Sequence, residues 1–165
     1  MTQGTALTPF FIFGSPRSGT SLLSRMIDSH KHLVVPNESL IFKMFSSFIH
    51  CYGDLSRLEN QRVLLQDILA TRVIGYWQPR PDFETVSGLI KRPGFAGVIE
   101  ALVCSTAKDK DLKAWGEKSP GHVFYWNEIK REFPQAKVIH IVRDGRDVAS
   151  SIINASMGPK TYHAA

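Results

Sequence analysis

The segment from Phe10 to Met26, FFIFGSPRSGTSLLSRM, constrains the fold more than any other part of the chain. A short apolar run enters a loop bounded by Gly14 and Gly19, and an amphipathic pattern follows the loop. This order predicts a buried strand, a tight turn and a helix whose first N–H groups have no partner within the helix. Hydroxyls in the loop and the positive end of the helix dipole favour a phosphate or sulfate ligand.

The loop differs from the nucleoside-triphosphate P-loop, G-x-x-x-x-G-K-S/T, at the residues that matter most. Gly14 and Gly19 have the same spacing, but Thr20 occupies the lysine position and the cation is Arg17, inside the loop. In the P-loop the lysine reaches the terminal phosphates and the next hydroxyl binds magnesium. A P-loop kinase or NTPase is therefore the less favoured interpretation. An ordinary strand-to-helix turn rich in small residues is a further alternative.

Composition indicates a globular chain with an anionic ligand. The 165 residues suffice for one domain over 1–165, and Lys plus Arg exceed Asp plus Glu by 20 − 15 = +5. The basic residues are scattered, so nucleic acid is not an expected partner. No apolar run has the length of a membrane span and no signal peptide is recognisable, so a cytoplasmic location is expected. Cys51 and Cys104 have no metal-site spacing and are expected to be small buried thiols.

Apolar periodicity predicts an α/β fold with a parallel sheet flanked by helices. The region 75–93, which contains three prolines, is expected to be an irregular surface excursion. The expected strands cover 10–13, 33–35, 112–115 and 138–142, and the expected helices cover 20–28, 40–49, 55–71, 95–107, 123–133 and 146–153.

Because parallel strands end at the same edge of a sheet, ligands bind beyond their carboxyl ends. In this chain the expected strands are followed by the Gly14 loop, Glu38, Lys118 and Arg143. We therefore expect these residues to meet at one edge. In the helix after the loop, Leu22, Leu23, Met26 and Ile27 are expected to form one apolar face.

The second informative segment is VIHIVRDGRDVASS, from Val138 to Ser151. Its strand delivers Arg143 to a helix start, Asp144 is the expected N-cap, and Ser151 follows Arg143 by eight residues. An arginine and a hydroxyl in this arrangement can bind a second phosphate, with Asp144 and Asp147 orienting the arginines. A capped helix with a structural Arg/Asp network, and Ser151 as a packing residue, is the alternative.

Together these two segments resemble the sulfotransferases that use 3′-phosphoadenosine 5′-phosphosulfate (PAPS). GSPRSGTS is similar to their 5′-phosphosulfate-binding loop, and VRDGRDVASS to their 3′-phosphate-binding segment. The resemblance implies a P-loop-like sulfotransferase architecture, PAPS as the donor and no metal. It also assigns two groups of donor-binding residues: Arg17, Ser18, Gly19, Thr20 and Ser21 for the 5′ end, and Arg143 and Ser151 for the 3′ phosphate.

Within the family, the chain is most similar to the bacterial branch related to tyrosylprotein sulfotransferases, through SPRSGT, PNES and WGEKSP. This similarity implies that Glu38 is the catalytic base and that Lys118, with Arg17, stabilises charge on the leaving bridging oxygen. The acceptor would be a hydroxyl or amine of a small molecule, peptide or carbohydrate. Cytosolic relatives carry a histidine two residues after the lysine, where this chain has Pro120; His122 is the second choice of base.

The resemblance covers 10–50 and 115–165 well, with Gly145 where many members have proline. Family members continue through further helices and a loop that closes over the nucleotide. The chain is therefore expected to be an N-terminal fragment, and an inactive nucleotide-binding remnant is an alternative to the enzyme. Trp77, Phe83 and Phe95 are expected to be packing residues, with an acceptor pocket as the alternative. The oligomeric state is left open.

Overall fold

The computed structural model describes residues 7–107, 109–155, 158–159 and 161. The first six residues, on which the signal-peptide expectation depends, and positions 162–165 of the expected domain lie outside this part. The elements in chain order are β1 (Thr8–Gly14), α1 (Thr20–Asp28), β2 (Leu33–Val34), α2 (Ile41–Phe45), the 3-10 helix η1 (Ser46–Tyr52), α3 (Leu58–Ala70), α4 (Arg72–Gly75), α5 (Phe83–Leu89), α6 (Gly94–Cys104), β3 (Ala114–Lys118), the 3-10 helix η2 (Pro120–Tyr125), α7 (Trp126–Glu132), β4 (Lys137–Ile141) and α8 (Gly145–Ile153).

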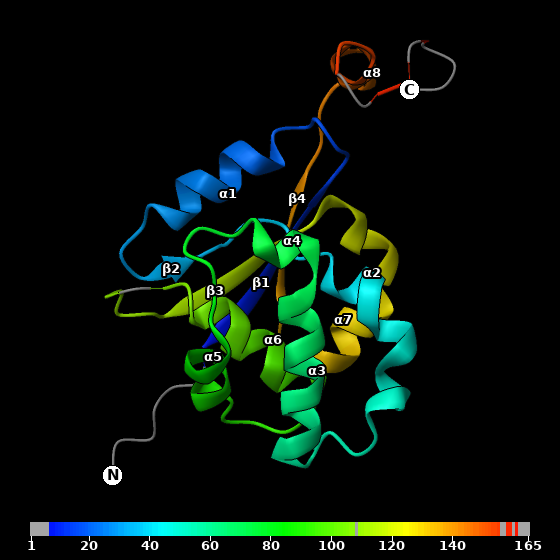
Figure 1. Ribbon diagram of the computed structural model, residues 1–165. Coiled ribbons are helices and arrows are strands. Elements are labelled where there is room, and N and C mark those ends of the chain that lie inside the picture. Colours follow the sequence, from blue (N-terminus) through cyan, green and yellow to red (C-terminus); the bar gives the residue numbers. More distant parts are fainter. Residues whose placement is uncertain (1–6, 108, 156–157, 160, 162–165) are drawn as a thin grey trace.

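Strand β1 lies inside an all-parallel sheet. In the described part of the chain the sheet has four strands in the order β2-β3-β1-β4. β1 pairs in parallel with β3 on one side and with β4 on the other. Parallel neighbours need long crossovers, and helices supply them (Figure 1). The predicted α/β class, a parallel sheet flanked by helices, is confirmed.

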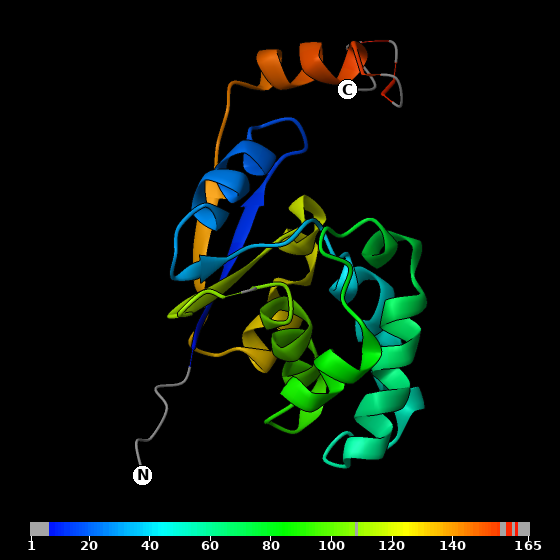
Figure 2. The same cartoon turned by 60° about the vertical axis from the view of Figure 1, so that its left-hand side comes forward.

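Side chains alternate along β1, so each face of the sheet has its own apolar cluster. Phe10 and Ile12 pack with Val35 and with half-buried side chains of α1. Phe11 and Phe13 belong to the larger core, to which α2, α3, α5, α6 and α7 contribute. Figure 2 shows α1 on one side of the sheet and α3 and α6 on the other. Phe11 is fully buried and anchors the larger core.

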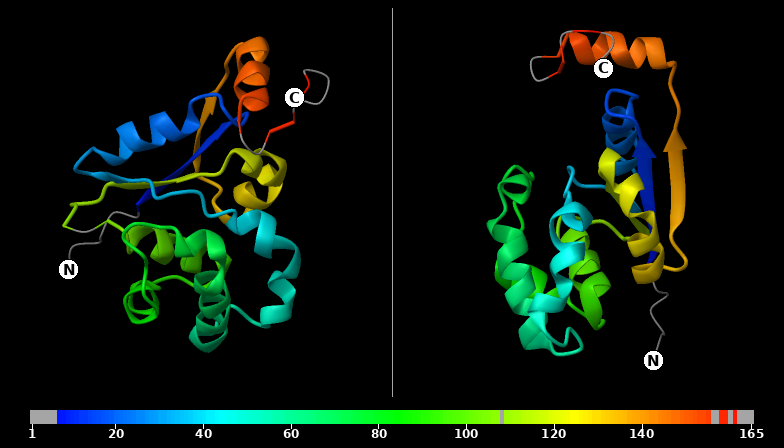
Figure 3. Two further views of the ribbon diagram at one scale, coloured as in Figure 1. Left: turned by 45° about the horizontal axis from the view of Figure 1, so that its top comes forward. Right: turned by 90° about the vertical axis from the view of Figure 1, so that its right-hand side faces the viewer.

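β4 is an edge strand, and its residues are exposed or half-buried. After the carboxyl end of β4 the chain leaves the sheet and forms α8, which lies apart from the sheet and from the helices that flank it (Figure 3). Asp144 caps α8 by accepting a hydrogen bond from the backbone N–H of Arg146 at 2.9 Å. The predicted N-cap is therefore confirmed.

The region 75–93 is not the irregular surface excursion that its prolines predicted. It contains helix α5, and Trp77 and Val86 within it are buried at 1% and 0% exposure. Asp82 caps α5 by accepting from the Thr85 N–H at 2.9 Å. Aspartate is a preferred N-cap residue, so Asp82 was an available signal for a helix start, but the three prolines led us to expect an irregular segment.

Several predicted boundaries also change. The predicted helix 40–49 is α2 followed by 3-10 turns, and the first part of the predicted helix 123–133 is 3-10 as well. The predicted strand 112–115 runs instead from Ala114 to Lys118. On α1, Leu23 and Ile27 pack against the sheet, whereas Leu22 and Met26 are 68% and 63% exposed. Only half of the predicted apolar face is therefore covered.

Both cysteines are free thiols. Cys51 is exposed, so the expectation of a buried thiol is wrong there, and Cys104 is half-buried. Among the described residues, no helix combines the length and the apolar character needed to cross a membrane.

The close approach of β3 to β1 explains Gly116. A Cβ atom at Gly116 would lie 2.3 Å from the ring of Phe10. We expect Gly116→Ala to lower the free energy of unfolding by about 1–3 kcal/mol, measured by urea denaturation, because overpacking forces the ring to move. Gly88→Ala in α5 is the control, since no described atom outside its own helix backbone and its chain neighbours lies within 4 Å of its Cβ position. Equal free energies of unfolding for Gly116→Ala and Gly88→Ala would contradict the close contact between Gly116 and Phe10.

Candidate active site

The structure brings the expected site residues to one edge of the sheet. The loop 15–19 follows β1, and Lys118 is the last residue of β3. Glu38 lies in the segment between β2 and α2, and Arg143 lies between β4 and α8. Since all four strands are parallel, these positions share the carboxyl edge, as the sequence predicted.

The loop after β1 has the backbone of an anion-binding turn. A Cβ atom at Gly14 would lie 2.8 Å from Ser18 Oγ, so only glycine fits there. Arg17 and Gly19 both have positive φ, 69° and 104°. The Ser18 hydroxyl donates to the Ser15 carbonyl at 2.6 Å and closes the turn. Among the described residues no side chain caps α1, so its first N–H groups remain available to a ligand.

The loop 15–19 and the segment 143–151, which carry the two sequence motifs, contact each other directly. Arg17 Nε donates to Ser151 Oγ at 3.0 Å, and Arg143 Nη1 donates to the Arg17 carbonyl at 3.1 Å. Arg143 Nε also lies 3.6 Å from Asp147 Oδ2, one helical turn away. The loop after β1 and the start of α8 thus form one cluster, with two guanidinium groups at the surface.

Lys118 and Glu38 form an ion pair beside the loop. Lys118 Nζ lies 2.6 Å from Glu38 Oε1 and 3.1 Å from Ser21 Oγ in the first turn of α1. The Lys118 side chain is 5% exposed, whereas that of Glu38 is 40% exposed. The lysine is therefore held in place, and the carboxylate is open to an incoming group.

Trp77 holds the backbone of Glu38. Its indole Nε1 donates to the Glu38 carbonyl at 3.0 Å, and its side chain is 1% exposed. Phe95 is buried in the same core and Phe83 packs against it. The expectation that Trp77, Phe83 and Phe95 are packing residues is confirmed.

Sequence reasoning missed the buried carboxylate of Glu117, which precedes Lys118 in β3. Its Oε1 accepts from Ser39 Oγ at 2.7 Å and from Ser119 Oγ at 2.6 Å. Its Oε2 lies 2.8 Å from His122 Nδ1. The available signal was a glutamate directly after the apolar residues Ala114–Gly116 of the strand, because a buried carboxylate needs partners.

Burial by itself raises the pKa of Glu117, since a charged carboxylate loses its water. The charge of His122 and the hydrogen bonds from His122, Ser119 and Ser39 act in the opposite direction and outweigh burial. The pKa of Glu117 therefore lies below its ordinary value, and the group is ionised at neutral pH.

His122, the second choice of catalytic base, is fully buried. Its Nδ1 contacts Glu117, and its Nε2 has no hydrogen-bond partner within the described residues. Its ring packs edge-on against Phe42 at a centroid distance of 5.4 Å. A side chain without exposed surface cannot take a proton from an acceptor, so this placement argues for a structural role.

Two pockets adjoin the site. One, of about 320 Å³, is lined by Ser15 and Pro16 of the loop and by Phe124 of η2. The other, of about 100 Å³, is lined by Arg25 of α1 and by Asn37, which precedes Glu38.

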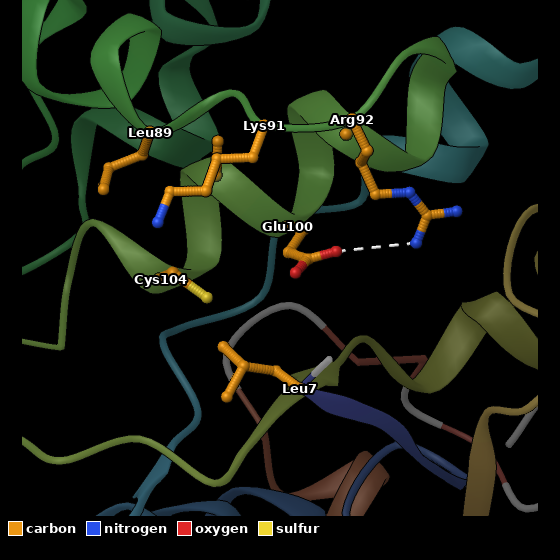
Figure 4. A pocket seen from close by; sticks show the side chains of 8 residues that line it. Leu7, Leu89, Lys91, Arg92, Glu100 and Cys104 are labelled. Carbon is orange, nitrogen blue, oxygen red and sulfur yellow. Dashed lines mark ion pairs between the residues drawn. The ribbon is translucent and has the colours of Figure 1, made fainter. Parts of the chain in front are cut away.

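A further pocket, of about 180 Å³, lies between α6 and the residue that precedes β1 (Figure 4). Leu7 marks the amino end of β1, so this pocket is at the edge opposite the site. Arg92 and Glu100 form an ion pair across it at 3.5 Å. Burial, followed by the charge of Glu100, raises the pKa of Cys104 to about 12, so its thiol is not a nucleophile at neutral pH.

Within the described ranges, no group of three or more His, Cys, Asp and Glu side chains is placed to hold a metal ion. The expectation of metal-free chemistry remains a prediction.

The model of a family described as "Sulfotransferase family" matches residues 9–164. No curated protein matches the chain.

The Glu117 network predicts a specific acid sensitivity. A carboxyl whose pKa is lower in the folded chain stabilises fully above its unfolded pKa, and this stabilisation is lost as pH falls through the folded pKa. We expect the free energy of unfolding, measured with urea, to fall as pH is lowered from about 6 to about 3. Glu117→Gln should show a smaller fall, whereas the exposed Glu84→Gln should behave like the wild type. Identical pH dependence in wild type and Glu117→Gln would contradict the assignment.

Proposed function

Since the chain belongs to the sulfotransferase family, we propose that it transfers a sulfuryl group from PAPS to a hydroxyl or amine acceptor. In this reaction the acceptor oxygen or nitrogen forms a bond to sulfur, while the bond from sulfur to the bridging phosphate oxygen breaks. Adenosine 3′,5′-bisphosphate leaves with the electron pair, and the acceptor loses a proton.

The observation that carries this proposal is the contact between the two motif segments. Ser151 lies 134 positions from Arg17, yet the two side chains are joined at 3.0 Å. A ligand that fills both segments must have anionic groups at two separate points. PAPS has them, with a 5′ phosphosulfate and a 3′ phosphate.

At the 5′ end, the loop and the start of α1 supply N–H groups to the phosphosulfate. Ser18 and Thr20 are buried at 7% and 3% exposure. We assign the backbone N–H groups of Gly19 and Thr20 to the ligand, whereas Ser18, whose N–H donates to the Ser15 carbonyl at 3.1 Å, shapes the loop around it. Arg17 adds a charged guanidinium with several N–H donors, and the exposed Ser21 adds a hydroxyl.

At the 3′ end, Arg143 and Ser151 are assigned to the phosphate. The Arg143 guanidinium is 43% exposed, and its carboxylate partner Asp147 is 62% exposed at 3.6 Å. An exposed pair at this distance is weak. The guanidinium therefore retains donors for a phosphate, with which arginine forms charge-assisted and often bidentate hydrogen bonds.

Glu38 is assigned as the base and Lys118, with Arg17, as the group that stabilises the leaving oxygen. An ammonium has three donors, and within the described residues Lys118 uses two, toward Ser21 and Glu38. The third donor is left for the bridging oxygen. Glu38, 40% exposed, is positioned to accept the acceptor's proton.

We place the chain within the family in the bacterial branch related to tyrosylprotein sulfotransferases, on the segments 15–20, 36–39 and 115–120. The proposed acceptor is a small molecule, a peptide or a carbohydrate. A cytoplasmic location remains a prediction.

Binding and turnover together test the proposal. Titration calorimetry should show binding of adenosine 3′,5′-bisphosphate without magnesium, and PAPS should release the bisphosphate when phenols, alcohols and amines are offered as acceptors. Binding without release for every acceptor would identify an inactive remnant. Tighter binding of ATP with magnesium than of the bisphosphate would indicate a P-loop NTPase.

Removing the guanidinium of Arg143 should weaken the bisphosphate. We expect Arg143→Ala to cost about 1.5–3 kcal/mol, a factor of roughly 10 to 150 in Kd by calorimetry, because a charge-assisted contact is lost. Arg146→Ala is the matched control: Arg146 is 91% exposed and pairs with Asp144. An unchanged Kd for Arg143→Ala would remove this residue from the 3′ site.

Removing the ammonium of Lys118 should act on turnover. We expect Lys118→Met to lower kcat by about a hundredfold or more, because charge on the leaving oxygen is no longer stabilised, while the apolar stem still packs. The exposed Lys130→Met in α7 is the control. A variant with normal kcat and a raised KM for the acceptor would make Lys118 a substrate-binding residue instead.

A further inference from the structure

Glu117 is adjacent to Lys118 but serves the other face of the sheet. Neighbouring residues of a strand point to opposite faces, and Lys118 bonds to Ser21 of α1. Glu117 pairs in register with Phe11, whose side chain lies in the larger core. Its side chain is 1% exposed, so it cannot contact the donor or take a proton from an acceptor.

The hydrogen bonds of Glu117 converge on the segment that carries Glu38. Ser39 donates to Glu117 Oε1 from its hydroxyl at 2.7 Å and from its backbone N–H at 3.3 Å. Ser119, held by the same oxygen, accepts from the backbone N–H groups of Ser39 and Leu40, both at 3.2 Å. One buried oxygen thus organises the backbone immediately after Glu38.

This segment needs such support because of Leu40. Its φ is 52°, a left-handed conformation that a leucine adopts only when its surroundings enforce it. The bond from the Leu40 N–H to Ser119 Oγ is part of that enforcement. On the other side, Trp77 fixes the carbonyl of Glu38 at 3.0 Å.

We propose that Glu117 is a positioning residue, which holds the segment 38–40 against the end of β3 so that the Glu38 carboxylate meets the Lys118 ammonium. Glu117 and Lys118 are consecutive, so the same strand end fixes both members of the ion pair. The inference rests on the proposed function, because it gives a catalytic purpose to the position of Glu38.

A glutamine can keep only part of this arrangement, and it removes the negative charge in either orientation. Oε1 of Glu117 accepts from two hydroxyls, and Oε2 faces the His122 ring nitrogen at 2.8 Å. If the amide NH₂ of glutamine took the Oε1 position, the Ser39 and Ser119 hydroxyls would lose their acceptor. If the NH₂ took the Oε2 position instead, it would face His122, and the negative charge of the carboxylate would still be lost. Glu117→Gln therefore tests the network with little change in volume.

Hydrogen exchange measured residue by residue by NMR tests the structural half of the proposal without any need for activity. In Glu117→Gln, the amides of Ser39 and Leu40 should exchange at least about tenfold faster, while the amides of β1 keep their rates. Glu84→Gln, which removes an exposed carboxylate, should match the wild type. Unchanged exchange at Ser39 and Leu40 would overturn the proposal, and so would faster exchange throughout β1, since Glu117 would then support the fold as a whole.

A double-mutant cycle tests the catalytic half, with release of adenosine 3′,5′-bisphosphate from PAPS as the readout and phenols, alcohols and amines as probe acceptors. Glu117→Gln should lower kcat at least about tenfold in the wild-type background but less than about twofold in Glu38→Gln, with the Kd of the bisphosphate unchanged in both. Equal losses in the two backgrounds, or a parallel rise in Kd, would overturn the positioning role. Absence of turnover in the wild type would refute the proposed function instead, and the exchange rates would still decide whether Glu117 holds the segment.

Discussion

The parallel pairing of β1 on both of its sides is the constraint on which the rest of the structure depends. β3 and β4 run beside it in the same direction, so three loops leave the sheet at one edge. Phe11, buried in the larger core, and Ile12, buried toward α1, fix β1 from both faces. With the central strand held this way, the position of each loop follows from the register of its strand. The site is therefore an outcome of sheet pairing more than of any single loop.

The two guanidinium groups at this edge are oriented mainly by neutral acceptors. Arg17 donates to the hydroxyl of Ser151, and Arg143 donates to a backbone carbonyl. The carboxylate of Asp147 lies 3.6 Å from Arg143, but this exposed pair is weak. Lys118 has one carboxylate partner, Glu38, together with a hydroxyl. Neutral acceptors fix the direction of a guanidinium without cancelling its field. The edge thus offers oriented positive charge to a ligand with several negative charges.

Features that depend on neighbours in sequence were predictable, and features that depend on distant contacts were not. The helix Thr20–Asp28 and the cap at Asp144 follow from local spacing and capping chemistry, and both are confirmed. The bond between Ser39 and Glu117 joins positions 78 apart, and no local pattern indicates it. Asp82 is the N-cap of α5, but the nearby prolines favoured the prediction of an irregular segment there. The catalytic and binding roles assigned to individual residues remain predictions, since chemistry is not visible in packing alone.

The position of Arg17 between the loop and α8 has an energetic consequence. Its side chain contacts Ser151, and its carbonyl receives Arg143, so one residue belongs to both halves of the site. Helix α8 lies beyond the layered body, and this contact is one of its ties to the loop. Groups that share a partner do not contribute independently to binding. For the proposed function we therefore expect the two ends to act as one coupled unit, in which occupancy at one end alters the affinity at the other.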